Sequence, residues 1–222
     1  MRITKLEHAC LMLEKGQRRL CLDPGKFTTP ITEASQVDAV VVTHEHDDHW
    51  TPEQLGRIAA RSPGVQVLTT ERTAQLVQQA RIPDLGEVHV GRPGETVSLG
   101  AFSVTCFGGE HAEIHSSIPI VDNLGVVVDG AVAYGGDAYD LPPDAFEIDL
   151  LAVPANGPWM RIADSIDFVI AVRPRRVMGV HEMLLSRAGK ELAAARLRDA
   201  AEQVGAEFVD LAPYAVLDLD AR

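Results

Sequence analysis

Three histidines and three carboxylates occupy the six consecutive positions from His44 to His49. An apolar run at 37–42 comes directly before them, and Thr51-Pro52 follows with the features of a helix start. Neutral imidazoles and carboxylates are common ligands of zinc-like cations. The pattern therefore predicts a metal site at the end of a buried strand.

The spacing within this cluster favours two ions rather than one. Because residues two apart in an extended stretch face the same way, His44 and His46 can bind one ion. Asp48 and His49 come later, where the chain turns toward the helix, and can bind a second ion. Two ions about 3.5–4 Å apart need a shared anionic ligand, and Asp137, in a glycine-rich loop, suits that bridging role.

Other residues of ligand type also follow apolar runs. His111, Asp137 and His181 each come within a few residues of the end of a predicted strand. Active sites in α/β folds gather at strand ends, because loops converge there on a rigid sheet. We therefore expect these three side chains to join the His44–His49 cluster.

The elements that must position these residues alternate along the chain. Strands are expected at 2–7, 10–14, 18–22, 37–43, 65–68, 87–90, 95–99, 101–107, 123–129, 131–135, 149–153, 176–180, 207–210 and 214–218. Helices are expected at 52–61, 71–80, 161–172 and 187–204. Thr51 is the expected N-cap of the first helix, with Gln54 placed for a capping box. Two mixed sheets with helices outside would satisfy the layer rule.

Length and charge narrow the class of protein. The chain has 222 residues, 46% of them apolar, which suits one domain over 1–222 with a substantial core. Its formal charge is −12, which disfavours nucleic acid as a partner. We find no signal peptide and no membrane-length apolar stretch, so we expect a cytoplasmic protein without membrane contact. The three cysteines, Cys10, Cys21 and Cys106, are expected to be reduced and buried.

The cluster also matches a family signature. His44-Glu45-His46-Asp47-Asp48-His49 resembles the His-x-His-x-Asp-His signature of the metallo-β-lactamase superfamily, and the resemblance extends over nearly the whole chain. Segments 6–10, 22–25, 108–111 and 135–137 resemble its ascorbate-phosphate-lactonase-like branch. The resemblance implies an α/β fold, a four-layer αββα sandwich of two mixed β-sheets with helices on the outer faces.

The same resemblance implies a role for each matching residue. His44, His46 and His111 would hold the first metal, Asp48, His49 and His181 the second, and Asp137 would bridge them. The cofactors would be two divalent metal ions, with zinc the first expectation and manganese and iron as alternatives. Lactamases proper commonly have a cysteine at the position of Asp137, which argues against antibiotic hydrolysis.

The expected activity is hydrolysis of a lactone, ester or amide of a small metabolite. A hydroxide bridged between two metal ions would attack the substrate, and Asp48 would orient it and accept its proton. One alternative is a phosphodiesterase or nuclease of the same fold. Another is a non-hydrolytic metal-binding sensor or redox protein. The sequence leaves the oligomeric state open.

Several nearby residues keep two interpretations. His115, four residues after His111, is a rival ligand or a pocket residue. Asp23 either forms a turn or orients metal ligands. His8 either faces the pocket or is a structural strand-end histidine. Trp159 either lines the substrate cleft or packs in the core.

Overall fold

The structure is a computed structural model that describes residues 1–220. Two seven-stranded sheets form its centre. The first sheet has the order β14-β1-β2-β3-β4-β5-β6 and the second the order β13-β12-β11-β10-β9-β8-β7. In each sheet a run of antiparallel strands joins a run of parallel strands at one central strand, β3 in the first and β10 in the second. Both sheets are therefore mixed, as predicted.

The strands and helices have the following bounds. The first sheet consists of β1 (Arg2–Lys5), β2 (Leu11–Lys15), β3 (Arg18–Leu22), β4 (Val37–Val41), β5 (Val65–Thr69), β6 (Leu85–Val90) and β14 (Val216–Asp218). The second consists of β7 (Thr96–Leu99), β8 (Phe102–Phe107), β9 (Gly125–Val128), β10 (Val132–Tyr134), β11 (Leu150–Pro154), β12 (Arg176–Val180) and β13 (Glu207–Phe208). The helices are α1 (Pro52–Arg61), α2 (Glu71–Ala80), α3 (Ile162–Val172) and α4 (Arg187–Gln203).

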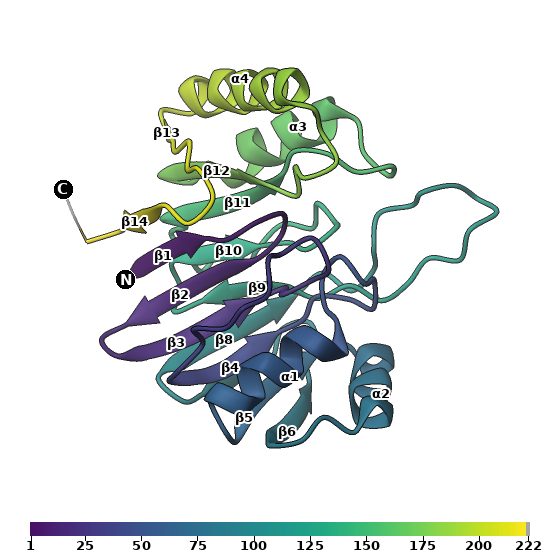
Figure 1. Cartoon of the computed structure of the whole chain (residues 1–222). Helices are drawn as coiled ribbons and strands as arrows, with labels where there is room; N and C mark the ends of the chain where they lie inside the picture. Colours follow the sequence, from purple (N-terminus) through teal and green to yellow (C-terminus); the bar gives the residue numbers. More distant parts are fainter. Residues whose placement is uncertain (221–222) are drawn as a thin grey trace.

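Three apolar layers separate the sheets and the helices. The central layer joins the facing sides of the two sheets, with Leu11 and Leu13 from β2 and Val126 and Val128 from β9 among its members. A second layer packs α1 and α2 on the outer side of the first sheet, and a third packs α3 and α4 on the outer side of the second. Figure 1 shows the two helix pairs on opposite sides of the sheets. The expected four-layer αββα sandwich is confirmed.

The capping box predicted for α1 is only half formed. Thr51 accepts a hydrogen bond from the backbone N–H of Gln54, as an N-cap should. The Gln54 side chain does not return to Thr51. Its amide instead accepts from the backbone N–H of Ile31 and donates to the carbonyl of Thr28. The prediction was wrong on this point because a tertiary contact to the 23–31 loop competes for the same side chain.

Several strand ends differ from prediction by two residues, including those of β6, β13 and β14, and two further cases lie next to the polar clusters. The strand predicted over 37–43 ends at Val41, because the N–H and hydroxyl of Thr43 bond to Asp23 instead of a neighbouring strand. The strand predicted over 123–129 begins at Gly125, since the Asn123 side chain bonds to the Gly135 carbonyl. The three cysteines are free and buried, as expected. Among residues 1–220, no helix is long and apolar enough to cross a bilayer.

Candidate metal centre

Four strand ends meet at one edge of the sandwich and carry the predicted site residues. His44–His49 follow β4, His111 follows β8, Asp137 follows β10 and His181 follows β12. Two groups of potential ligands result, each with its ligand atoms within 4.8 Å of one another. One group is His44, His46, His111 and Asp137; the other is His8, Asp48, His49 and His181. All seven residues singled out in the sequence thus lie together.

Asp137 touches both groups. Its Oδ2 lies 3.9 Å from His44 Nε2 and 3.5 Å from His111 Nε2 in the first group. In the second group, His49 Nε2 is 3.3 Å from Oδ1 and His181 Nε2 is 3.2 Å from Oδ2. The carboxylate therefore lies between two clusters of imidazole nitrogens, where a ligand shared by two ions would have to lie.

The outward-facing ring nitrogens fix the tautomers of three histidines. Nδ1 of His49 donates to Asp23 Oδ2 at 2.7 Å, while Nδ1 of His111 and of His181 donates to a backbone carbonyl at 2.6 Å. A neutral imidazole that donates through Nδ1 has its lone pair on Nε2. Such outer hydrogen bonds are the usual partners of metal-bound histidines. All three Nε2 atoms are thereby prepared to coordinate a cation.

Unpartnered polar atoms test whether a cation fits. Six buried side-chain nitrogen or oxygen atoms of the described chain lack a hydrogen-bond partner, and four of them belong to this site: His49 Nε2, His111 Nε2, Asp137 Oδ1 and His181 Nε2. Leaving buried polar groups unpaired is costly, so a cluster of them points to a ligand that satisfies them together. Nitrogen and carboxylate donors at this spacing fit divalent metal ions.

The first two histidines of the cluster face each other. His44 Nε2 and His46 Nδ1 are 2.9 Å apart, and His44 Nδ1 lies 3.0 Å from the Thr43 hydroxyl. The Thr43 hydroxyl donates to Asp23, so it accepts from His44 Nδ1–H. His44 therefore presents Nε2, and His46 presents Nδ1, to the same point.

Asp23 is the common support of both groups. It is fully buried, and its carboxylate accepts from the Thr43 N–H and hydroxyl, each at 2.8 Å, as well as from His49. Of its two interpretations, the structure favours the one in which it orients the imidazoles. The neighbouring Gly25 packs so closely that an added Cβ would lie 1.8 Å from the carbonyl oxygen of Asp48. Only glycine allows this approach of the two loops.

Burial and charge separate the protonation states within the site. Burial raises the pKa of the Asp137 carboxyl, but His49 and the contacts from His111 and His181 outweigh it, so the pKa falls well below its usual value. Burial lowers the pKa of His181, yet the Asp137 and Asp48 carboxylates raise it to about 9. Burial together with nearby His49 keeps the pKa of His44 well below its usual value. Without metal, the site thus pairs ionised carboxylates with protons that a cation must displace.

The sequence did not predict the contacts that Trp159 and His8 make with the carboxylates of the site. Trp159 Nε1 donates to Asp137 Oδ2 at 3.0 Å, so this tryptophan supports the central carboxylate as well as packing at the core edge. His8 is fully buried and its Nε2 lies 3.2 Å from Asp48 Oδ2. Neither lies near the His44–His49 signature in sequence. The available signals were their residue types beside predicted elements and, for His8, the family resemblance of segment 6–10.

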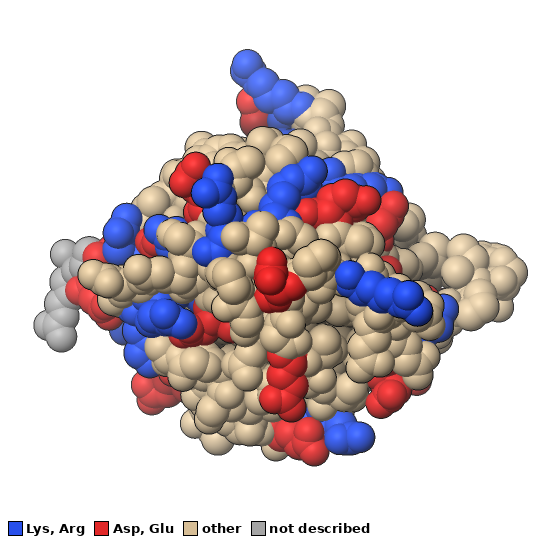
Figure 2. All heavy atoms as spheres, turned by 60° about the horizontal axis from the view of Figure 1, so that its bottom comes forward, with Lys and Arg blue, Asp and Glu red and all other residues tan. Residues whose placement is uncertain are grey.

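His115 does not join either group. A backbone hydrogen bond from the His111 N–H to the Val121 carbonyl closes the neck of a projecting loop, and His115 lies beyond that neck. Its ring is exposed and bonds to Ser117. In Figure 1 the loop is the long teal segment between β8 and β9, and Figure 2 shows this projection almost without charged side chains. Ile118 and Ile120 on it are 45% and 52% exposed.

An open hollow of about 510 Å³ adjoins the first group. Its lining includes His111 itself, the aromatic ring of Tyr139 and two carboxylates, Glu110 and Asp140. Burial and the nearby Glu110 raise the pKa of Asp140. No lysine or arginine belongs to this lining among the described residues. Without bound metal, the hollow therefore favours uncharged or cationic molecules over anions.

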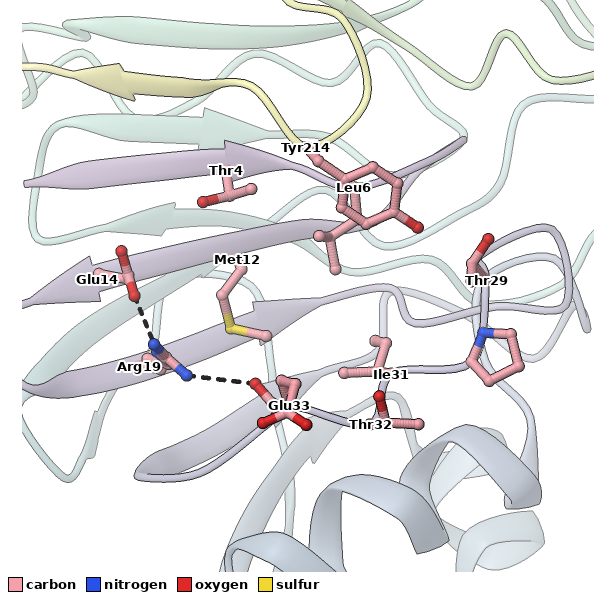
Figure 3. Close-up of a pocket in the computed structure, with 11 residues that line it drawn as sticks. Thr4, Leu6, Met12, Glu14, Arg19, Thr29, Ile31, Thr32, Glu33 and Tyr214 are labelled. Atoms are coloured by element: carbon pink, nitrogen blue, oxygen red, sulfur yellow. Dashed lines mark hydrogen bonds and ion pairs between the residues drawn. The ribbon is translucent and has the colours of Figure 1, made fainter.

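A second groove of about 490 Å³ lies away from both groups. It runs over the outer side of β1–β3 and is lined by Leu6, Met12, Ile31 and Tyr214, with Arg19 held by Glu14 at its edge (Figure 3). No histidine lines it. Of these two cavities, the hollow beside His111 is the one that adjoins a group of candidate metal ligands.

Comparison with known proteins gives a consistent result. The family described as "Beta-lactamase superfamily domain" matches residues 2–181. Protein Rv0786c of Mycobacterium tuberculosis is 31% identical over 205 residues, which cover 90% of this chain and 92% of that protein. A UPF0173 metal-dependent hydrolase of Nanoarchaeum equitans, NEQ378, is 28% identical over 195 residues, covering 82% and 83%.

A solved structure shows the same fold. Igni18, a metallo hydrolase from the archaeon Ignicoccus hospitalis, superposes with a TM-score of 0.71 at 16% identity and covers 97% of each chain. At this identity the likeness concerns the fold alone.

Proposed function

This chain belongs to the β-lactamase superfamily and is a metal-dependent hydrolase; on that premise we propose that it holds two divalent cations and cleaves a lactone, ester or amide of a small metabolite. The observation that carries this proposal is the pair of His/Asp groups that meet at Asp137, which belongs to the first group and contacts the second. Each group offers at least three donors, and their unpartnered nitrogens face inward.

The proposed ligand sets follow the two groups. His44, His46 and His111 would hold the first ion, Asp48, His49 and His181 the second, and Asp137 would contact both. When bound, the two cations would supply a water activated at neutral pH and a Lewis acid for the substrate carbonyl. We propose zinc as the native metal, because imidazole nitrogen dominates the first set and supplies half of the second.

Asp48 has the position and charge to orient the attacking water. Burial raises the pKa of its carboxyl, but hydrogen bonds from His181 and His8 lower it well below its usual value. The carboxylate therefore stays ionised at neutral pH and accepts hydrogen bonds. A base with so low a pKa takes up a proton weakly, so orientation is its larger contribution.

The surroundings of the centre favour an uncharged substrate. Glu110 and Asp140 in the hollow would repel a phosphodiester, and the −12 charge of the chain would repel nucleic acid at long range. Tyr139, which belongs to the lining, gives the hollow an aromatic side, and its ring packs against Trp159 behind it with 5.5 Å between centroids. A neutral acyl compound fits this wall better than a phosphate ester.

A metal-reconstituted protein tested on matched substrates decides the proposal. We expect turnover of a panel of lactones, esters and amides, with little or none of phosphodiesters. His46→Ala and Asp48→Ala should each lose metal and lower kcat/KM by at least 10²-fold. His115→Ala is the matched control, because this exposed histidine lies outside both groups. Full metal content and full rate in both site variants would refute the assignment, and turnover confined to phosphodiesters would refute the substrate class.

A further inference from the structure

His8 lies in the short turn between β1 and β2, far in sequence from the signature cluster. Its backbone has a φ of +57°, a left-handed conformation that few residues other than glycine adopt. This conformation turns the fully buried imidazole toward Asp48, and it leaves the His8 carbonyl to accept the N–H of His181 at 2.9 Å. One turn thus contacts two proposed ligands of the second ion.

The hydrogen bonds of His8 fix its tautomer. The backbone N–H of Met183 donates to His8 Nδ1 at 3.3 Å. A ring nitrogen that accepts a hydrogen bond has no proton, so the proton of the neutral ring is on Nε2. That Nε2–H lies 3.2 Å from Asp48 Oδ2 and donates to it.

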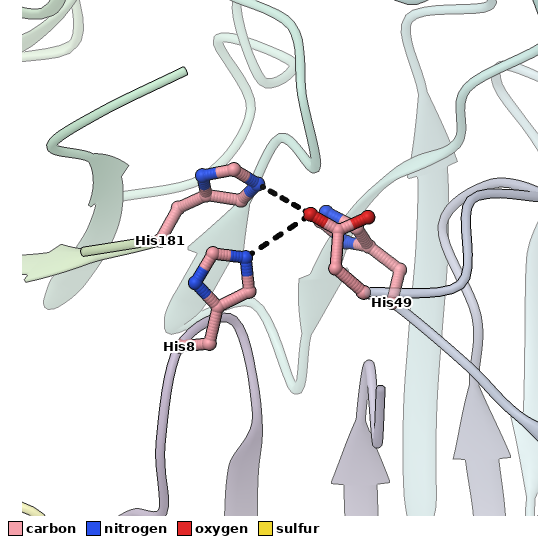
Figure 4. Close-up of side chains that lie close together, drawn as sticks. His8, His49 and His181 are labelled. Carbon is pink, nitrogen blue, oxygen red and sulfur yellow. Dashed lines mark hydrogen bonds and ion pairs between the residues drawn. The ribbon is translucent and has the colours of Figure 1, made fainter. Parts of the chain in front are cut away.

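This arrangement is opposite to that of the proposed ligands. In His49 and His181, Nδ1 donates outward, so in the neutral rings that a metal would bind, Nε2 has the free lone pair. In His8 the lone pair is used by Met183 and the proton faces the site. Figure 4 shows His8 and His181 approaching the same carboxylate from one side, beside His49.

We infer that His8 is a positioning residue for the second metal site and not a fourth ligand of that ion. Its Nε2–H holds one oxygen of Asp48, so the carboxylate keeps the orientation in which it can bind the ion and direct the water. Packing keeps the ring in place, because the His181 ring lies 4.0 Å and the Phe27 ring 5.0 Å from it between centroids. The inference rests on the proposed two-ion function and adds a residue outside the signature to it.

Zinc titration of three variants tests this role. Each protein is stripped of metal and titrated with zinc against a chromophoric chelator, which resolves the two binding steps. We expect His8→Ala to weaken zinc binding at the Asp48–His49–His181 site about 10–100-fold and to leave zinc binding at the other site nearly unchanged. His8→Gln retains an N–H donor at the end of its side chain, so it should restore the affinity of the Asp48–His49–His181 site to within about threefold of wild type. His89→Gln, on half-buried β6, is the control for the substitution itself.

Nitrogen-15 spectra of the imidazoles in the zinc-loaded wild type give a second measurement that needs no variant. We expect His8 to have a protonated Nε2 and an unprotonated Nδ1. An unprotonated, zinc-bound Nε2, or failure of His8→Gln to restore binding, would overturn the inference in favour of a fourth ligand. Unchanged zinc binding by His8→Ala would also overturn it. These outcomes are distinct from failure of the proposed function, which would appear as fewer than two zinc ions bound by the wild type.

Discussion

Replacing Asp23 by asparagine should weaken the second metal site without touching any proposed ligand. In the structure, Asp23 Oδ1 accepts the Thr43 N–H, and Oδ2 accepts both the Thr43 hydroxyl and His49 Nδ1–H. Asparagine can keep its oxygen at the first position, which leaves its NH₂ facing His49. An NH₂ group donates, so Nδ1 of His49 must accept and its proton must move to Nε2. The lone pair that faces the metal site is then lost.

The size of the effect follows from this change of tautomer. Loss of an outer hydrogen-bond partner of a metal-bound histidine typically costs 10–100-fold in metal affinity. That range corresponds to about 1.4–2.8 kcal/mol of binding free energy. The first ion should be affected less, because Asp23 reaches His44 only through the Thr43 hydroxyl.

Zinc titration with stepwise competition measures both sites of Asp23→Asn. Asp38→Asn is the matched control, because Asp38 is also a buried carboxylate, within β4, but bonds to Arg18 and the Ala101 N–H, outside both groups. The control should lose thermal stability and keep both zinc ions. If Asp23→Asn binds both ions as tightly as wild type, the tautomer argument is refuted.

Three further perturbations test other parts of the account. Gly25→Ala places a Cβ 1.8 Å from the Asp48 carbonyl oxygen, so it should lower the Tm and weaken zinc binding. Gly56→Ala on α1 is the control and should do neither, because the nearest atom to its added Cβ is 3.9 Å away. Equal behaviour of the two variants would contradict the close-approach argument. The pKa of His181 is raised to about 9 without metal, so zinc must displace its proton at pH 7. Zinc affinity should therefore rise between pH 6 and 9 with proton release, measured by calorimetry in buffers of different ionisation enthalpy; a pH-independent affinity would count against it. Removal of bound metal by a chelator should lower the Tm by roughly 10 °C, since a ligand at 1,000 times its Kd stabilises the folded state by about 4 kcal/mol. An unchanged Tm would show that the ions do not bind the folded site tightly.

The main features of the fold and site were predictable because their signals are local. The bounds of α1 and α2 match the prediction, since Thr51 and Thr70 cap them and each helix has a clear apolar face. The candidate residues could be grouped from the sequence because strand ends converge in this architecture, and polar residues after an apolar run are visible in one sequence. His44 and His181 could thus be grouped although they lie far apart in the sequence.

The parts that could not be predicted depend on distant contacts. The role of His8 depends on a left-handed turn and on Met183, which is 175 residues away. The Gln54 side chain had a favourable local partner in Thr51, and a tertiary partner in Ile31 took its place. His115 has the right residue type and spacing for a ligand, but a backbone bond closes the loop before it. No single-sequence pattern carries these three-dimensional preferences.

Anomalous X-ray diffraction at the zinc edge, from crystals of zinc-loaded protein, tests the central claim most directly. The account predicts two peaks per chain, about 3.5–4 Å apart, with Asp137 in contact with both. The peak nearer His111 should also contact His44 and His46, and the other should contact Asp48, His49 and His181. A single peak, or a second peak away from Asp137, would contradict a two-metal hydrolase.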